Sequence, residues 1–504
     1  MSSSVSSSGA DSTSALTVID NAFVVTVDQQ RRELSNTTVV IDGTRIVSVG
    51  AAPADLPAGA VRVDGTGCVL TPGLINTHHH LYQWITRGLA ADHTLFQWLT
   101  TLYPIWAGID EMAVRTAALG GLAQLALSGC TTTTDHHYVF PAEGGDLLGA
   151  EIDAAATIGL RFHPTRGSMD LSEKDGGLPP DSVVQSIDEI LAASSDAVSR
   201  WHDPADDSML RIALAPCSPF SVTTDLLRES ATLARDLDVR MHTHLAESLD
   251  ENTYCDEHFG CTPLQYMESV GWVGDDVWFA HGIEFDDDEI GRLAATSTGV
   301  AHCPTSNARL GNRICRTRDL VDAGVPVGLG VDGAASNESC RLLEEAHQAV
   351  LMARARGGPT ALTTRTAIEL ATIGGARVLG RAADTGSIEP GKLADLVLWD
   401  LTSVAHSGID DPVAALVLGA IPPIAASWVN GRRVVDAGTL LTVDTERVAA
   451  DVAREHRRLI EKKGSAATQA LLKADNAMWQ SGKTMVETTA TPLANQPSPY
   501  IKGV

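Results

Sequence analysis

The chain has 504 residues, of which 44% are hydrophobic, and it carries a formal net charge of −26 at pH 7. This length allows two or three average domains or one barrel with insertions, and the apolar content suffices for a large core. The negative charge argues against nucleic acid and against an anionic membrane surface as partners, because both are bound through basic patches.

The N-terminal residues 1–14 are rich in serine and lack the charged and apolar regions of a signal peptide, so we expect a flexible tail. No run of 18 apolar residues occurs, and no membrane span is expected. The eight cysteines contain no C-x-x-C pair, and several lie within apolar runs. They are typical of reduced core residues, so the sequence predicts a cytoplasmic protein.

Residues 15–68 alternate apolar and polar positions and contain turn signals such as Asp42-Gly43. Residues 386–440 resume this pattern close to the other end of the chain. Alternation with a period of two is typical of half-buried strands. We therefore expect the two flanking segments to pair and to form a small β-sandwich domain.

The central residues 69–385 contain eight short β-like runs separated by helical stretches, for example 111–127 and 183–198. The runs lie near residues 69–78, 131–138, 160–168, 211–218, 239–247, 277–283, 299–307 and 326–333. This alternation of strands and helices predicts an α/β fold, a (β/α)₈ TIM barrel. Active sites of such barrels form at the C-terminal ends of the strands, so polar residues at those ends are the candidates.

The first run ends in His78-His79-His80. Because side chains alternate along a strand, His78 and His80 point the same way, whereas His79 should face the barrel wall. Two imidazoles from one strand end supply half of a zinc site. A polar loop after a strand is the plain alternative, but a Pro-Gly-Leu-x-x-x-His-x-His run is rare by chance.

The next stretch, residues 81–106, is rich in aromatic residues, although these make up only 5% of the chain. They are Tyr82, Trp84, Phe96, Trp98, Tyr103 and Trp106. Such a cluster fits an active-site lid, and it fits a hydrophobic contact between subunits equally well.

The fifth run contains His242 and His244, which share one face of a strand, so the spacing alone allows either to bind a metal. His244 lies nearer the strand end, and Glu247 follows three residues later. We therefore assign His244 as the ligand and His242 as a packed residue lower in the barrel. A carboxylate next to a metal site meets the requirement for a proton shuttle, which is the role predicted for Glu247.

Two later runs each end in one polar residue, His281 and Asp332. Asp332 can bind a metal and accept a proton from water, while His281 can hydrogen-bond the same water or the leaving group. A lone histidine after a strand is usually structural, but its place in this ordered series favours a catalytic role. The sequence thus predicts four metal ligands, namely His78, His80, His244 and Asp332.

Residues 441–480 have a helical pattern rich in Arg, Lys and Glu, which predicts a helical segment with a solvated face. Residues 481–504 are rich in proline and threonine, and we expect them to be disordered. The pattern of the helical segment does not indicate which surface it packs against.

Together these residues resemble the amidohydrolase superfamily, and within it the mononuclear aminohydrolases, over about residues 15–440. The most similar branch is that of the 8-oxoguanine deaminases, followed by the hydroxyatrazine ethylaminohydrolases. The stretches that carry this resemblance are residues 76–83, 101–106, 166–177 and 215–222. The resemblance implies hydrolytic removal of an amino group from a nitrogen heterocycle. The implied substrate is 8-oxoguanine or the smaller isocytosine, with N-alkylated s-triazines as the alternative.

The resemblance also implies one zinc ion per subunit, with iron or another divalent metal as the alternative, and a homo-oligomer of two or more subunits. In similar guanine deaminases, a glutamine at the position of Gln83 contacts the purine, and a phenylalanine at the position of Phe220 contacts the ring. A surface glutamine and a core phenylalanine are the plain interpretations of the same two residues.

Two rival functions share this kind of barrel. Binuclear cyclic amidases bridge two metals with a carboxylate, commonly a carboxylated lysine on the fourth strand. The corresponding run, 211–218, contains neither lysine nor glutamate, and of the seven lysines only Lys174 precedes Lys392. A metal-free scaffold would have lost ligands, and all four are present. Both rivals are therefore disfavoured.

Overall fold

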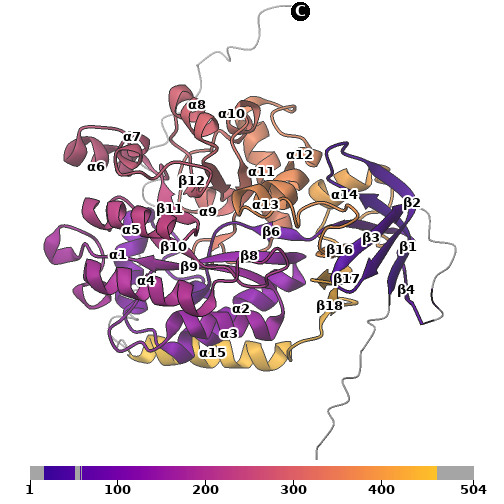
Figure 1. Cartoon of the computed structure of the whole chain (residues 1–504), viewed down its shortest axis with the longest axis horizontal. Coiled ribbons are helices and arrows are strands. Elements are labelled where there is room, and N and C mark those ends of the chain that lie inside the picture. Colours follow the sequence, from indigo (N-terminus) through magenta and orange to yellow (C-terminus); the bar gives the residue numbers. More distant parts are fainter. Residues whose placement is uncertain (1–15, 51–56, 58, 463–504) are drawn as a thin grey trace, which may run out of the picture.

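The computed structural model describes residues 16–50, 57 and 59–462. The predicted tails 1–14 and 481–504, and the predicted helical segment beyond residue 462, lie outside the described residues. The described chain forms a barrel with a β-sheet at one side, as Figure 1 shows. Among the described residues, no helix is both long and apolar enough to cross a membrane.

Eight parallel strands close the barrel, and each pairs with the next in chain order until β14 returns to β6. They are β6 (Leu74–Asn76), β8 (Cys130–His137), β9 (Arg161–Ser168), β10 (Ala213–Pro216), β11 (Met241–Leu245), β12 (Val277–His281), β13 (Gly299–His302) and β14 (Val327–Leu329). The predicted (β/α)₈ fold is confirmed. All C-terminal strand ends therefore meet at one mouth of the barrel.

Helices surround the barrel and connect its strands (Figure 1). They are α1 (Leu95–Trp106), α2 (Glu111–Leu127), α3 (Leu147–Ile158), α4 (Ile187–Trp201), α5 (Thr224–Asp236), α6 (Leu249–Phe259), α7 (Pro263–Ser269), α8 (Asp287–Thr296), α9 (Pro304–Arg309), α10 (Thr317–Ala323), α11 (Leu342–Gly357), α12 (Thr364–Glu369) and α13 (Gly375–Val378). The helix predicted over 111–127 coincides with α2. The helix predicted from residue 183 begins at Ile187, because Ser186 forms a capping box with Glu189.

The two flanking segments pair with each other in one continuous sheet of nine strands. Its strands are β1 (Thr17–Val25), β2 (Glu33–Asp42), β3 (Arg45–Gly50), β4 (Val61–Asp64), β5 (Cys68–Pro72), β16 (Leu396–Asp400), β17 (Ile424–Val429), β18 (Arg432–Asp436) and β19 (Thr439–Leu440). The sheet has its own hydrophobic core, which includes Ile19, Leu396 and Trp428. The short helix α14 (Pro412–Leu418) lies between β16 and β17 in the chain.

The run predicted as the first barrel strand, residues 69–78, is divided between two sheets. Its first part belongs to β5, which pairs with β1 and β16 in the flanking sheet, and only the part after Gly73 enters the barrel. A Cβ atom at Gly73 would lie 2.1 Å from Oγ1 of Thr131. The glycine therefore lets the chain pass close to the second barrel strand as it leaves one sheet for the other.

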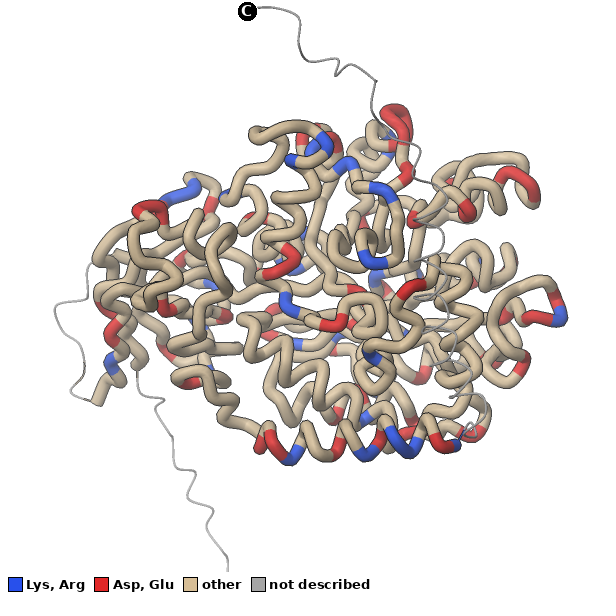
Figure 2. The backbone as a smooth tube through the Cα atoms, turned by 180° about the vertical axis from the view of Figure 1, so that it is seen from behind, with Lys and Arg blue, Asp and Glu red and all other residues tan. Residues whose placement is uncertain are grey.

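The predicted C-terminal helical segment contains α15 (Thr445–Lys462), which lies along α2 at the edge of the barrel (Figure 1). Figure 2 shows that acidic and basic residues alternate along this helix. Arg458 donates two hydrogen bonds to the carboxylate of Asp110, at 2.6 and 2.7 Å, and Nδ1 of His456 donates to the carbonyl of Ile85 at 2.7 Å. Because Asp110 also caps α2, the ion pair joins both helices at one point.

A buried ion pair connects the barrel to the flanking sheet. Arg161 of β9 contacts both carboxylate oxygens of Asp395, at 2.9 and 3.1 Å, and the two side chains are 1% and 2% exposed. The carboxylate also accepts the backbone N–H of Asn430 at 2.6 Å. Such a pair is strongly destabilising to break, because removal of one partner leaves an uncompensated buried charge.

We expect Asp395→Ala to lower the free energy of unfolding by roughly 3–5 kcal/mol, because the Arg161 guanidinium would remain buried without its partner. The exposed pair between Arg115 and Asp153 provides a control, with side chains 42% and 60% exposed. Asp153→Ala should cost about 0–1 kcal/mol. Urea unfolding followed by circular dichroism measures both. Equal midpoints for the two variants would contradict the structural role of the buried pair.

Candidate active site

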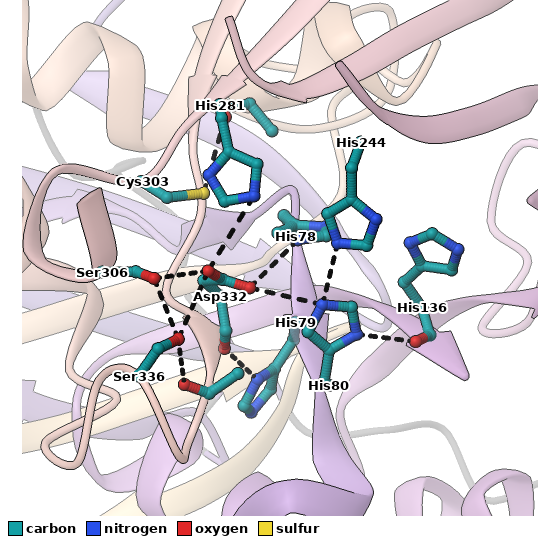
Figure 3. Close-up of polar contacts among 12 residues, drawn as sticks. His78, His79, His80, His136, His244, His281, Cys303, Ser306, Asp332 and Ser336 are labelled. Carbon is teal, nitrogen blue, oxygen red and sulfur yellow. Dashed lines mark hydrogen bonds and ion pairs between the residues drawn. The ribbon is translucent and has the colours of Figure 1, made fainter. Parts of the chain in front are cut away.

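Five side chains meet at the C-terminal mouth of the barrel, in front of a small cavity (Figure 3). They are His78 two residues after β6, His80 in β7 (His79–His80), His244 in β11, His281 at the end of β12 and Asp332 at the start of β15 (Asp332–Gly333). The short strands β7 and β15 pair with each other, which joins the first and last barrel strands at this mouth. His244 is partly exposed and the other four side chains are buried.

The hydrogen bonds behind His80 and His244 fix the tautomer of each ring. Nδ1 of His80 donates to the backbone carbonyl of His136 at 2.7 Å, and Nδ1 of His244 donates to the carbonyl of Cys217 at 2.6 Å. A carbonyl can only accept, so each neutral ring carries its proton on Nδ1 and presents the lone pair of Nε2 to the site. This is the arrangement that a metal-binding histidine requires.

His78 is held in the same tautomer by a hydrogen bond to His242. Nδ1 of His242 donates to the carbonyl of Trp278 at 2.9 Å, so its Nε2 accepts from Nδ1 of His78 at 2.8 Å. Burial lowers the pKa of His242 well below its usual range, which keeps the ring neutral. His242 also stacks on Trp278, with ring centroids 4.4 Å apart. Nε2 of His78 is therefore free to face the site, and His242 lies deeper in the barrel behind it.

The free nitrogen atoms lie close to one another and to one carboxylate. Nε2 of His80 is 3.1 Å from Nε2 of His244, and Oδ1 of Asp332 is 3.1 Å from Nε2 of His78 and 3.3 Å from that of His80. Unprotonated nitrogen atoms at this separation repel each other unless a cation lies between them. Three imidazoles and one carboxylate are a donor set that fits zinc or a similar divalent ion.

Two overlapping groups of side chains have ligand atoms within 4.8 Å of one another. One group consists of His78, His80, His136 and His244, and the other of His78, His244, His281 and Asp332. All four predicted ligands occur in their union, whereas His242 occurs in neither group. His79 points away, as expected for its position, and its Nδ1 donates to the backbone carbonyl of Asp332 at 2.6 Å.

Glu247 lies on the turn that follows β11, and its carboxylate is buried beside the cluster. Ala246 adopts a left-handed conformation with φ of 54°, and Glu251 accepts the backbone N–H groups of Ala246 and Glu247 at 3.0 Å each. This clamp turns the Glu247 side chain towards His281, whose Nε2 is 3.5 Å from Oε2 of Glu247. Burial raises the pKa of Glu247, and the charge of His281 partly offsets that effect.

His281 and Asp332 both have left-handed backbones, with φ of 73° and 60°. Such strain in residues other than glycine is concentrated at functional sites. Nδ1 of His281 donates to Oδ1 of Asn307 at 2.9 Å, so its Nε2 faces Glu247 and Asp332. Burial lowers the pKa of His281, but the charges of Glu247 and Asp332 outweigh it, so the pKa is raised overall.

The cavity in front of the cluster has apolar and aromatic walls with a few polar groups. Its lining includes Leu95, Trp98 and Leu99 of α1 together with Phe220 and Leu310, and its polar groups include Tyr103, Tyr138, Ser218 and Ser336. The aromatic stretch predicted as a lid or subunit contact thus supplies one wall through α1. The cavity volume is about 30 Å³, which is room for about one water molecule.

The two predicted substrate contacts lie in different surroundings. Phe220 is part of the cavity wall and packs edge-to-face against Phe96, with ring centroids 5.2 Å apart. Gln83 lies in the helical turn η1 (Leu81–Thr86), fully buried behind Gly333, and its Oε1 accepts the backbone N–H of Ala335 at 3.4 Å. Its Nε2 has no hydrogen-bond partner among the described residues. The roles of both residues in substrate binding stay predictions.

The structure also brings together residues that were not identified from the sequence. Ser306 donates to Oδ2 of Asp332 at 2.5 Å, Asn307 accepts from His281, and Asn312 donates to Oε1 of Glu247 at 3.1 Å. Ser306 and Asn307 lie four and five residues after β13, at the end of the predicted run 299–307, so the strand-end rule that found His281 could have found them. Asn312 carries no such signal, because it lies in a loop 65 residues from Glu247.

Comparison with known proteins agrees with this arrangement. Residues 69–436 match the model of the amidohydrolase family. The chain is 47% identical over 392 residues to an 8-oxoguanine deaminase of Pseudomonas aeruginosa, covering 77% of this chain and 86% of the relative. It is 38% identical over 405 residues to a hydroxydechloroatrazine ethylaminohydrolase of a Pseudomonas species, covering 78% and 83%.

Among solved structures, the chain is similar to an atrazine chlorohydrolase from Arthrobacter aurescens complexed with zinc. The TM-score is 0.83 at 33% sequence identity, and the match covers 87% of this chain and all of that one. The shared fold, the matched sequence and the strand-end histidines and acids agree with one another. The chain therefore belongs to the amidohydrolase family, and it is a hydrolase acting on C–N bonds.

Proposed function

We propose that the protein is a zinc-dependent hydrolytic deaminase that converts 8-oxoguanine to urate and ammonia, with isocytosine as a smaller substrate. The observation that carries the proposal is the convergence of three histidine Nε2 atoms and Asp332 beside the buried carboxylate of Glu247. The similarity to the Pseudomonas aeruginosa 8-oxoguanine deaminase supports the choice of substrate. Removal of an alkylamine from an s-triazine, as named for the Pseudomonas relative, is the alternative.

A single divalent ion fits the cluster better than a bridged pair. The ligands proposed for it are His78, His80, His244 and Asp332. The fourth barrel strand, β10, offers neither lysine nor glutamate as a bridge, and Lys174 is 63% exposed and pairs with Asp181. When bound, the ion lowers the pKa of a coordinated water towards ~7, so that hydroxide is available near neutral pH.

The protein side chains then manage the protons. Oδ2 of Asp332 accepts the proton that water loses, and Nε2 of His281, fixed by Asn307, holds the water towards the carbon that bears the amino group. Glu247 protonates the adjacent ring nitrogen, so attack gives a neutral tetrahedral centre instead of a ring anion. The proton held by Asp332 passes to the amino group, the C–N bond breaks, and ammonia leaves, while the proton of the added hydroxyl returns to Glu247 as the carbonyl forms.

The cavity favours a flat heterocycle but does not yet hold one. Trp98 and Phe220 offer apolar faces, and burial raises the pKa of Tyr103 and Tyr138 well above the usual value, so both hydroxyls stay available as donors to a carbonyl. A cavity of about 30 Å³ is far smaller than ligand pockets of roughly 300–1,000 Å³. We therefore infer that α1, which forms one wall, moves outwards when substrate enters.

We expect the purified protein to contain about one divalent metal per chain, zinc being favoured by the histidine-rich donor set. Elemental analysis after gel filtration measures the ratio. Removal of the metal with a chelator should abolish activity, and one equivalent of zinc should restore it. Two tightly held metals per active chain would contradict the mononuclear site.

The roles of His244 in β11 and of Glu247 on the turn after it can be separated by substitution. His244→Ala should lose both metal and activity, because a ligand is gone. Glu247→Gln should keep its metal but lose turnover by ~10²–10⁴-fold, the value of a positioned proton transfer. His258→Ala, on the exposed face of α6, serves as the control and should change neither quantity. Near-normal turnover by Glu247→Gln would rule out the shuttle role.

Substrate preference follows from the polar groups available to a lactam edge. We expect kcat/KM for 8-oxoguanine to exceed that for guanine, isocytosine and hydroxyatrazine in one buffer, because a site that pairs with a lactam rejects rings that leave its groups unpaired. Gln83→Ala should reduce 8-oxoguanine turnover more than metal content. A preference for hydroxyatrazine would move the assignment to the triazine branch, and inactivity of zinc-loaded protein on all four would refute it.

A further inference from the structure

One short segment after β13 contacts each of the three side chains to which proton transfer is assigned. Ser306 donates to Asp332 at 2.5 Å, His281 donates to Asn307 at 2.9 Å, and Asn312 donates to Glu247 at 3.1 Å. Asp332, His281 and Glu247 lie at or just beyond the ends of three different barrel strands, whereas their partners lie within seven consecutive residues. The proposed mechanism assigns no substrate or metal contact to any of these three partners.

The segment is built as a compact unit. It begins with α9, which has Pro304 in its first turn, and it ends in a tight turn at Gly311, where φ is 75°. The backbone N–H of Asn312 donates to the carbonyl of Asn307 at 2.8 Å, which fixes the two asparagines relative to each other. Leu310, between them, lies in the cavity wall. The positions of His281 and Glu247 relative to each other are thereby set by a single segment of the chain.

We propose that residues 306–312 are the orienting element of the active site and that Asn312 is the positioning residue for Glu247. The inference rests on the shuttle role proposed for Glu247. Nδ2 of Asn312 donates to Oε1, which leaves Oε2 on the side of His281, 3.5 Å from its Nε2. An amide donates a hydrogen bond without giving up its proton, so Asn312 fixes the carboxylate but does not compete in proton transfer.

Asn307 acts in the same way on His281. Its Oδ1 can only accept, so it holds the proton of His281 on Nδ1 and directs Nε2 to the cavity. The side-chain amides of Asn307 and Asn312 thus fix the orientation of His281 and Glu247, two of the groups to which proton transfer is assigned. An amide that merely filled space could be replaced by a side chain of equal volume without loss of activity. An amide that orients its partner through a donated hydrogen bond could not.

The test uses Asn312→Ala and the isosteric Asn312→Asp, each made in the wild-type and in the Glu247→Gln background. In zinc-loaded enzyme with 8-oxoguanine, both variants should lower kcat by ~10-fold or more while KM and metal content change less than about two-fold. In the Glu247→Gln background the same changes should have almost no further effect, because residues that act through one another are not additive.

Arg313→Ala provides the matched control, because Arg313 is the next residue, is exposed, and pairs with Glu284 at 3.2 Å instead of with Glu247. It should leave kcat unchanged. A crystal structure of zinc-loaded Asn312→Ala gives a readout that needs no substrate, and it should show the Glu247 carboxylate turned away from its position 3.5 Å from His281.

Several results would overturn the inference. These are normal kcat in Asn312→Asp, an equal loss in both backgrounds, loss of metal in Asn312→Ala, or an unmoved Glu247 carboxylate in the crystal structure. If Glu247→Gln is inactive while Asn312→Ala is normal, the positioning role fails and the shuttle survives. If Glu247→Gln itself turns over normally, the shuttle role and the inference built on it fail together.

Discussion

The structure of the active site depends on three hydrogen bonds from imidazole Nδ1 atoms to backbone carbonyls. His80, His244 and His242 donate to carbonyls of His136, Cys217 and Trp278, respectively. These acceptors belong to, or directly follow, the second, fourth and sixth barrel strands, so closure of the barrel determines where each ring points. The consequence is that several Nε2 lone pairs face one point, next to a carboxylate. That arrangement is unfavourable without a cation, and the rest of the fold must be stable enough to maintain it.

Part of the folding free energy of the barrel offsets strain in the backbone of the active site. Ala246, His281 and Asp332 all have left-handed conformations, each of which costs about 1–3 kcal/mol in a residue other than glycine. Each strained residue lies at or just beyond the C-terminal end of a barrel strand, where a functional side chain must turn into the cavity. The Glu251 carboxylate holds the first turn through two backbone N–H groups. The flanking sheet and α15 stabilise the barrel from outside, so they support the site without contacting it.

The periodicity of the sequence was sufficient for the barrel and for the side chains at strand ends. Alternation along a strand predicted that His78 and His80 face together, and proximity to the strand end favoured His244 over His242. The boundary at Gly73 was missed, although Pro72-Gly73 interrupts the apolar run and this dipeptide is a turn signal. Asn312, in contrast, was not predictable. Its partner Glu247 is 65 residues away, and a loop asparagine has many ordinary reasons to be present.

The size of the cavity connects the aromatic stretch with catalysis. Trp98 of α1 donates from Nε1 to the carbonyl of Ala335 at 3.1 Å, and Ala335 lies three residues after Asp332. Ala335 also donates its backbone N–H to Gln83. The wall that we infer to move when a heterocycle enters is therefore bonded to the loop that carries the proposed proton acceptor. Closure of α1 over a bound ring would restore this bond, so exclusion of water and orientation of Asp332 would occur in the same step.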